Sequence, residues 1–90
     1  MERRIVITGL GTVNPCGLDA PSTWEAVCAA RSGIGPITRF DASDLPCRIA
    51  GEVDGFDPSA HFSGREQRRL GLFMQYAIVA ASEAMGDAGF

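Results

Sequence analysis

The spacing of apolar residues along this 90-residue chain predicts two strands and two helices. Residues 3–17 read RRIVITGLGTVNPCG, and the β-branched run near their start is typical of a buried strand that ends in a tight turn at Gly9 and Gly11. Residues 47–53 alternate between two faces of mixed polarity, which predicts an edge or surface strand. The sequence SGIGP at residues 32–36 predicts a break in regular structure.

The first helix is expected at residues 22–31, directly after the opening turn. Ser22 can cap its N-terminus, and Glu25 lies three residues further on, where its side chain can return the bond. An apolar stripe at helical spacing comprises Trp24, Val27 and Cys28. This stripe predicts that Trp24 belongs to the hydrophobic core.

A longer helix is expected at residues 64–88, with Ser63 and Glu66 in the register of a capping box. Its apolar stripe follows steps of three and four residues and comprises Leu70, Phe73, Ala77, Ala80, Ala84 and Ala88. Together with Gly71 and Gly86, these alanines leave room for another element to approach closely. We therefore expect this helix to pack against a sheet or a second helix.

The opening glycines also permit a nucleotide-binding interpretation. A strand followed by Gly9 and Gly11 is how a dinucleotide-binding unit begins, because such glycines let the backbone approach a pyrophosphate. The same fingerprint needs Gly or Ala where this chain has Asn14, and Pro15 prevents a helix from running through this point. The pattern favours a structural turn and leaves a nicotinamide-dependent oxidoreductase as the weaker alternative.

Charge and composition exclude other classes. A formal net charge of −3 argues against a nucleic-acid-binding surface, which needs clustered basic residues over a broad face. No apolar run approaches the roughly 18 residues of a membrane span, and no signal-peptide pattern precedes the first strand. We therefore predict a cytoplasmic protein that binds neither nucleic acid nor membrane.

The cysteines and the single histidine do not form a recognisable site. Cys16, Cys28 and Cys47 contain no CxxC pair, so they predict reduced thiols without a metal or a disulfide framework. We assign each of them a structural role. His61 has no second ligand at ordinary metal-site spacing and is expected at the surface or at a helix end.

Three arginines are the best candidates for binding chemistry. Arg65, Arg68 and Arg69 lie at i, i+3 and i+4, so they share one side of the long helix near its start. Cations at a helix N-terminus oppose the helix dipole, and Glu66 is the nearest acid in sequence. The spacing is compatible with a solvated charged face and with a site for an external anion.

The order of motifs resembles a known family. After RRIVITGLGTVNPCG come RSGI, RFD, AGEV, FDP, REQRR and FMQYAIVAASEAMGDAG, and the series is similar to the N-terminus of β-ketoacyl-acyl-carrier-protein synthases, particularly the type II elongating enzymes. The resemblance implies an α/β chain: the N-terminal part of a thiolase-like layered α/β/α/β/α fold, incomplete here. Residues 1–90 would then form a truncated portion without an internal domain boundary, in which Gly89 closes the last helix and a strand would be expected next.

The resemblance also implies a function. The family joins an acyl thioester to malonyl carrier protein with loss of CO₂, using a cysteine and two histidines that this chain is expected to lack, so no catalytic residue is assigned. The resemblance implies that Arg65, Arg68 and Arg69 bind the acidic acyl carrier protein. It also implies that the substrates are attached to the carrier's phosphopantetheine, that no further cofactor is needed, and that the full-length enzyme is a homodimer. Relatives often carry an acidic residue where this chain has Gly71. That acid would anchor the helix, so its absence here bears on how firmly the segment is held. A non-catalytic partner subunit, similar to a chain-length factor, is the alternative.

Overall fold

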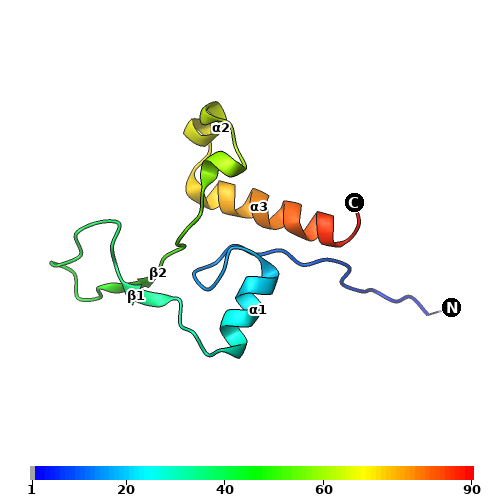
Figure 1. The fold of residues 1–90 in the computed structure, drawn as a ribbon, viewed down its shortest axis with the longest axis horizontal. Coiled ribbons are helices and arrows are strands. Elements are labelled where there is room, and N and C mark those ends of the chain that lie inside the picture. The colour runs from blue at the N-terminus through cyan, green and yellow to red at the C-terminus, as the bar shows by residue number, and fades with distance from the viewer. Residues whose placement is uncertain (1) are drawn as a thin grey trace.

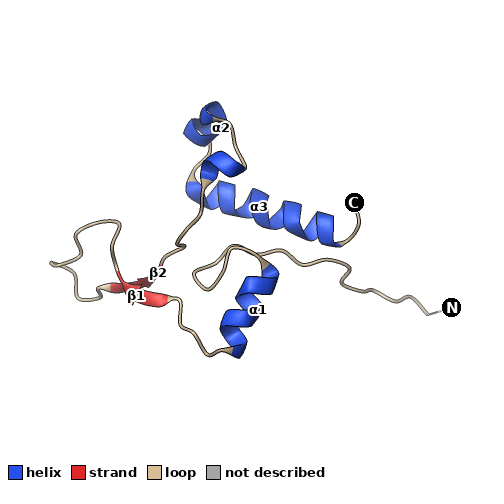
Figure 2. Ribbon diagram, viewed as in Figure 1, coloured by secondary structure: helices blue, strands red, loops and turns tan. Residues whose placement is uncertain are grey.

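The computed structural model describes residues 2–90 as a mixture of short strands and helices, in agreement with the predicted α/β class (Figures 1 and 2). The elements follow in the order α1 (Ala20–Cys28), β1 (Ile34–Pro36), β2 (Ile49–Gly51), the 3-10 helix η1 (Pro58–Ala60), α2 (Gly64–Arg69) and α3 (Leu72–Asp87). The layers of a complete thiolase-like fold are not formed by these elements alone. No helix within residues 2–90 has both the length and the apolar character needed to cross a membrane.

The opening segment is extended but forms no strand, so the prediction of a buried strand is wrong for the described residues. Ile5 is 99% exposed and Ile7 is 82% exposed. A strand needs a neighbour for its backbone N–H and C=O groups, and within residues 2–90 no second strand lies beside this segment. The β-branched residues therefore favour an extended backbone, but residues 2–90 contain no partner strand with which this segment could form a sheet.

The two glycines of the opening segment instead contact α3. A Cβ atom added at Gly9 would lie 2.7 Å from the backbone nitrogen of Ala88, and one added at Gly11 would lie 2.7 Å from that of Ala84. As the segment advances from Gly9 to Gly11, its contacts move back along the helix toward Ala80, so the two run antiparallel (Figure 1). This confirms the expected close approach at the alanines of the long helix.

Two carboxylates of α3 hold the opening segment in this position. The Asp87 carboxylate accepts a hydrogen bond from the backbone N–H of Leu10 at 3.1 Å. Both oxygens of Glu83 are used: Oε1 accepts from the N–H of Thr12 at 2.9 Å, and Oε2 accepts from the N–H of Ala20 at 2.8 Å. Because Ala20 is the first residue of α1, Glu83 ties three parts of the chain together.

Helix α1 begins two residues before the predicted start and ends three residues before the predicted end. Asp19 is the N-cap, and its carboxylate accepts from the N–H of Ser22 at 2.8 Å. The Ser22 hydroxyl completes the capping box by accepting from the Asp19 N–H at 3.3 Å. The prediction that Ser22 itself caps the helix is wrong because the acid three residues earlier, followed by Pro21 in the first turn, makes the stronger start signal.

The apolar stripe of α1 does not form a core in the described residues. Ala26 is buried, whereas Trp24 is 67% exposed and Val27 is 55% exposed. The predicted core position of Trp24 is therefore wrong for residues 2–90, where no element covers that face. Helical periodicity identifies the apolar face correctly but does not provide the surface that buries it.

Strands β1 and β2 form a two-stranded antiparallel sheet in which Gly35 pairs with Ala50. The expectation that residues 32–36 break regular structure is wrong, because three of them form β1. The prediction for residues 47–53 holds in part, since β2 is a short and largely exposed strand inside that range. Strand β1 ends at a proline, whose missing N–H is tolerated in a strand with only one neighbour.

The predicted long helix is interrupted, so α2 and α3 are separate helices. Leu70 and Gly71 are both extended, with ψ angles of 126° and 158°, and they form a two-residue joint. The N–H groups of Met74 and Gln75 both bond to the carbonyl of Gly71, which starts a new helix. Gly71 is therefore the N-cap of α3, not a site of close packing as predicted. At the other end Gly89, with φ of +90°, provides the expected glycine stop.

Candidate functional site

The three candidate arginines all lie on α2, a six-residue helix at the edge of the molecule (Figure 1). Arg65, Arg68 and Arg69 are exposed. A Cβ added at Gly64 would lie 3.7 Å from Nη1 of Arg68, so this guanidinium folds back over the first turn of the helix. The structure thus brings the three predicted residues together on one accessible helix, which we call the arginine surface.

The only acid within α2 is occupied by capping. The N–H of Ser63 donates to Oε1 of Glu66 at 3.0 Å, and the Ser63 hydroxyl accepts from the N–H of Glu66 at 3.2 Å, which confirms the predicted capping box. The backbone hydrogen bond from Ser63, then its hydroxyl and the positive charge of Arg69, lower the pKa of the Glu66 carboxyl. Since Glu66 turns toward the helix start, it does not neutralise the whole arginine surface.

Two glutamine side chains connect α2 to its flanking segments. Nε2 of Gln67 donates to the carbonyl oxygen of Phe62 at 3.1 Å, just before the helix. Nε2 of Gln75, on α3, donates to the carbonyl oxygen of Leu70 at 2.9 Å, just after it. Sequence analysis missed both contacts, although a glutamine within the apolar run of α3 is a visible signal of a buried polar role.

Gln75 is the only buried polar residue within residues 2–90, with 3% of its surface exposed. Its Oε1 atom has no hydrogen-bond partner in this part of the chain. An unpartnered buried acceptor costs about 1–3 kcal/mol, which is comparable to or larger than the roughly 0.5–1.5 kcal/mol that an ordinary hydrogen bond contributes. The contact with Leu70 therefore fixes geometry more than it adds stability.

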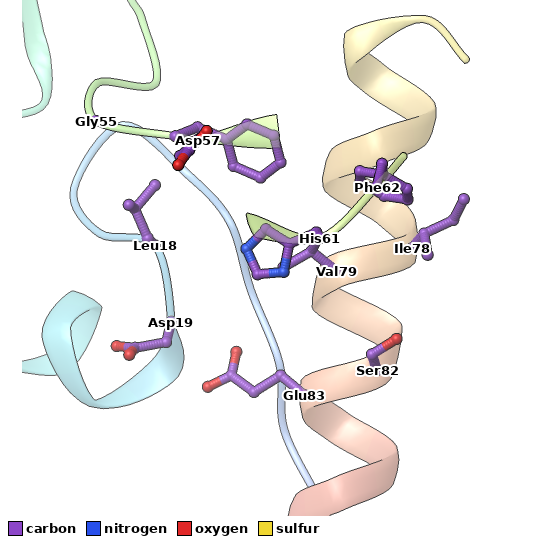
Figure 3. Close-up of a pocket in the computed structure, with 11 residues that line it drawn as sticks. Leu18, Asp19, Gly55, Asp57, His61, Phe62, Ile78, Val79, Ser82 and Glu83 are labelled. Atoms are coloured by element: carbon purple, nitrogen blue, oxygen red, sulfur yellow. The ribbon is translucent and has the colours of Figure 1, made fainter. Parts of the chain in front are cut away.

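A cavity of about 590 Å³ lies between the start of α1, η1 and α3 (Figure 3). Its three carboxylates already have structural partners: Asp19 caps α1, Asp57 accepts from the N–H of Ser59 at 3.0 Å, and Glu83 binds two backbone N–H groups. These hydrogen bonds, first those with Ser22 and Ser59, lower the pKa values of Asp19 and Asp57. No group of three metal-ligating side chains occurs in the described residues. The acids of this cavity serve helix starts and chain packing.

His61 lies where the sequence predicted it, exposed and at the C-terminal end of η1. Its ring stacks on Phe56 with 5.7 Å between centroids, and Phe56 meets Tyr76 of α3 edge-on at 5.0 Å. Phe62 is buried beside them. This aromatic cluster fixes η1, and with it the start of α2, against α3.

The cysteines occupy three unrelated places and are free thiols. Cys16 is half-buried in the opening turn, Cys28 is the exposed last residue of α1, and Cys47 is exposed two residues before β2. Their structural assignment stays a prediction.

The opening turn is closed by the side chain of Asn14. Its Oδ1 accepts from the N–H groups of Cys16 at 2.7 Å and Gly17 at 3.2 Å, and its Nδ2 donates to the hydroxyls of Thr12 and Thr23, each at 2.9 Å. All four hydrogen-bonding positions of the amide are used. Since the N–H groups of Cys16 and Gly17 bond to Asn14 itself, the turn offers little to a pyrophosphate.

Comparison with known proteins agrees with the motif series. Residues 2–90 match the family described as "Beta-ketoacyl synthase, N-terminal domain". The chain therefore belongs to the β-ketoacyl synthase family. It is 46% identical to 3-oxoacyl-(acyl-carrier-protein) synthase 2 of Coxiella burnetii over 98% of its length, and 42% identical to the protein of the same name from Synechocystis over 97%.

The likeness extends to three dimensions. A solved structure described as "The ishigamide ketosynthase/chain length factor" superposes on the whole chain with a TM-score of 0.85 at 36% identity. The chain spans 21% of the length of these two curated relatives and 22% of that solved chain. The predicted family is confirmed, whereas the reaction and the partners belong to proteins several times longer.

Proposed function

We propose that this chain is the N-terminal part of a 3-oxoacyl-(acyl-carrier-protein) synthase with a thiolase-like layered fold. The enzyme would be an acyltransferase that condenses an acyl thioester with malonyl carrier protein in fatty-acid synthesis. The observation that carries this proposal is the 41–46% identity to synthases of that name along nearly the whole chain. We expect the catalytic cysteine and histidines outside residues 1–90, a cytoplasmic homodimer, and no cofactor beyond the carrier's phosphopantetheine.

Within this function, the arginine surface would bind the acyl carrier protein. Arg65, Arg68 and Arg69 are exposed, adjacent and positively charged, and a carrier protein rich in carboxylates provides the complementary charge. Arginine forms charge-assisted hydrogen bonds with both carboxylates and phosphates, so it suits the acidic carrier and its phosphopantetheine attachment. The short capped helix presents these groups outward.

The test is charge reversal in a full-length synthase that contains this segment. Arg65→Glu together with Arg68→Glu should weaken carrier binding at low salt by about tenfold or more, since each exposed ion pair contributes up to about 1 kcal/mol and reversal adds repulsion. Arg31→Glu is the matched control, because Arg31 is also exposed but follows α1, a helix that lies well apart from α2 (Figure 1). Unchanged carrier affinity of the double variant at low ionic strength would refute the docking role.

A second candidate is a partner subunit that shares the fold and the carrier surface but lacks the nucleophile. The similar solved structure is described as a ketosynthase/chain length factor, so a subunit of this second kind belongs to the assembly from which that structure comes. The names of the curated relatives favour the enzyme. Reading the open reading frame beyond Phe90 distinguishes them: a cysteine nucleophile followed by two histidines means enzyme, and a substitution of that cysteine means partner subunit.

A further inference from the structure

The joint between α2 and α3 determines where the arginine surface points. Leu70 and Gly71 are both extended, and they separate the last arginine from the first residue of α3. Because a peptide unit is planar and rigid, the direction of the Leu70 carbonyl fixes the orientation of the peptide that joins these two residues. Gly71 has no side chain to restrict it, so another contact must hold this peptide.

That contact is the amide of Gln75. In an unbroken helix the carbonyl of Leu70 would accept from the N–H of Met74, but this N–H bonds to Gly71 instead, at 3.0 Å. Nε2 of Gln75 replaces the missing donor at 2.9 Å. The amide can face only this way, since the reverse orientation would place its oxygen against the carbonyl oxygen.

The burial of Gln75 makes the contact rigid. The residue is 3% exposed, so water competes poorly for its amide. Its Oε1 has no hydrogen-bond partner within residues 2–90, so the side chain is held there at a cost. By contrast, the start of α2 is held by several contacts, including the Ser63–Glu66 capping box and the bond from Gln67 to Phe62. The joint otherwise consists of backbone groups, so the buried amide of Gln75 is suited to fixing the angle between α2 and α3.

We propose that Gln75 is a positioning residue for carrier-protein docking, which it serves by fixing the joint peptide and thereby the direction of the arginine surface. This inference rests on the proposed function of that surface. Because Gln75 is buried, it would not contact the carrier itself. It acts through the Leu70 carbonyl on Arg68 and Arg69, the last two residues of α2.

The experiment uses a full-length synthase with Gln75→Met, which keeps the length of the side chain and removes the donor. We expect the KM for acyl carrier protein to rise about threefold to tenfold, which corresponds to the loss of one hydrogen bond, with little change in kcat. Turnover of a small acyl-pantetheine thioester, which has no carrier protein, should stay unchanged. Equal losses with both substrates would mean a merely structural role and would overturn the proposal, as would an unchanged KM.

A double-mutant comparison separates this inference from the function on which it rests. In a variant with all three arginines changed to alanine, Gln75→Met should cause no further rise in KM, because the surface it orients is gone. If the triple variant raises KM and Gln75→Met alone does not, the inference falls and the docking role stands. If the triple variant leaves KM unchanged, both fall. Should Gln75→Met fail to fold, Gln75→Leu, which also lacks the donor toward Leu70, replaces it in the same comparison.

Discussion

The contact between the opening segment and α3 can be tested with one methyl group, by Gly11→Ala. The added Cβ would overlap most with the carbonyl oxygen of Ala80, and it would lie 2.7 Å from the backbone nitrogen of Ala84. Both neighbours are backbone atoms of a helix, so they cannot rotate away as a flexible side chain would. The opening segment must therefore move away from α3 by about 1.5 Å to reach ordinary contact distance.

This displacement determines the size of the effect. The hydrogen bonds from Thr12 to Glu83 at 2.9 Å and from Leu10 to Asp87 at 3.1 Å would be stretched beyond the useful range. The bond to Glu83 is half-buried and the bond to Asp87 is exposed, so the latter contributes less. We expect a loss of about 2–4 kcal/mol in the free energy of unfolding, combining the charged hydrogen bonds with the packing strain.

Equilibrium urea unfolding of a full-length synthase measures this loss, with Gly86→Ala as the matched control. Gly86 lies inside α3, and within residues 2–90 nothing approaches a Cβ added there to within 4 Å. The control should stabilise by about 0.5–1 kcal/mol, the usual gain for alanine over glycine in a helix. A Gly11→Ala variant that unfolds within about 0.5 kcal/mol of the parent would contradict the packing described for this segment.

Two further predictions concern the helix that carries the arginines and its neighbour. Gly71→Asp should raise the unfolding free energy by a few tenths of a kcal/mol in urea titrations, because position 71 is the N-cap of α3 and glycine provides no side-chain acceptor; a loss would show that the Phe73 ring, 3.2 Å from the new Cβ, cannot give way. Because the pKa of the Glu66 carboxyl is lowered from its ordinary value of 4.5, the stability that Glu66 gives to α2 is fully present above pH 4.5. This stability is lost as the pH falls through the lower pKa of the folded state. The amide resonance of Ser63 should therefore titrate in this acid range, and Glu66→Gln, which can still complete the capping box, should remove the titration while keeping the helix; an unchanged titration in the variant would contradict the assignment.

Local rules succeeded where a few neighbouring residues decide the outcome. The Ser63–Glu66 capping box and the glycine stop at Gly89 were both readable because each depends on contacts within one turn. The predicted start of α1 is wrong although it too depends on neighbouring residues, because two residues give the same capping signal. Asp19 lies three residues before Ser22 and is the one that caps the helix. The arginine surface was predicted from spacing, whereas Gln75, which lies beyond the joint, was not.

The sequence by itself determined the family, the capped start of α2 and the grouping of its three arginines, because these depend on motif order and on helical spacing. Only the tertiary structure decided that the helix breaks at Leu70 and Gly71, that the opening segment lies along the alanines of α3, and that the side chain of Gln75 spans the joint. Each of these outcomes depends on which distant groups supply hydrogen-bond partners and packing surface. Local propensity carries no information about such partners, so it predicts a strand and a continuous helix where the fold forms neither.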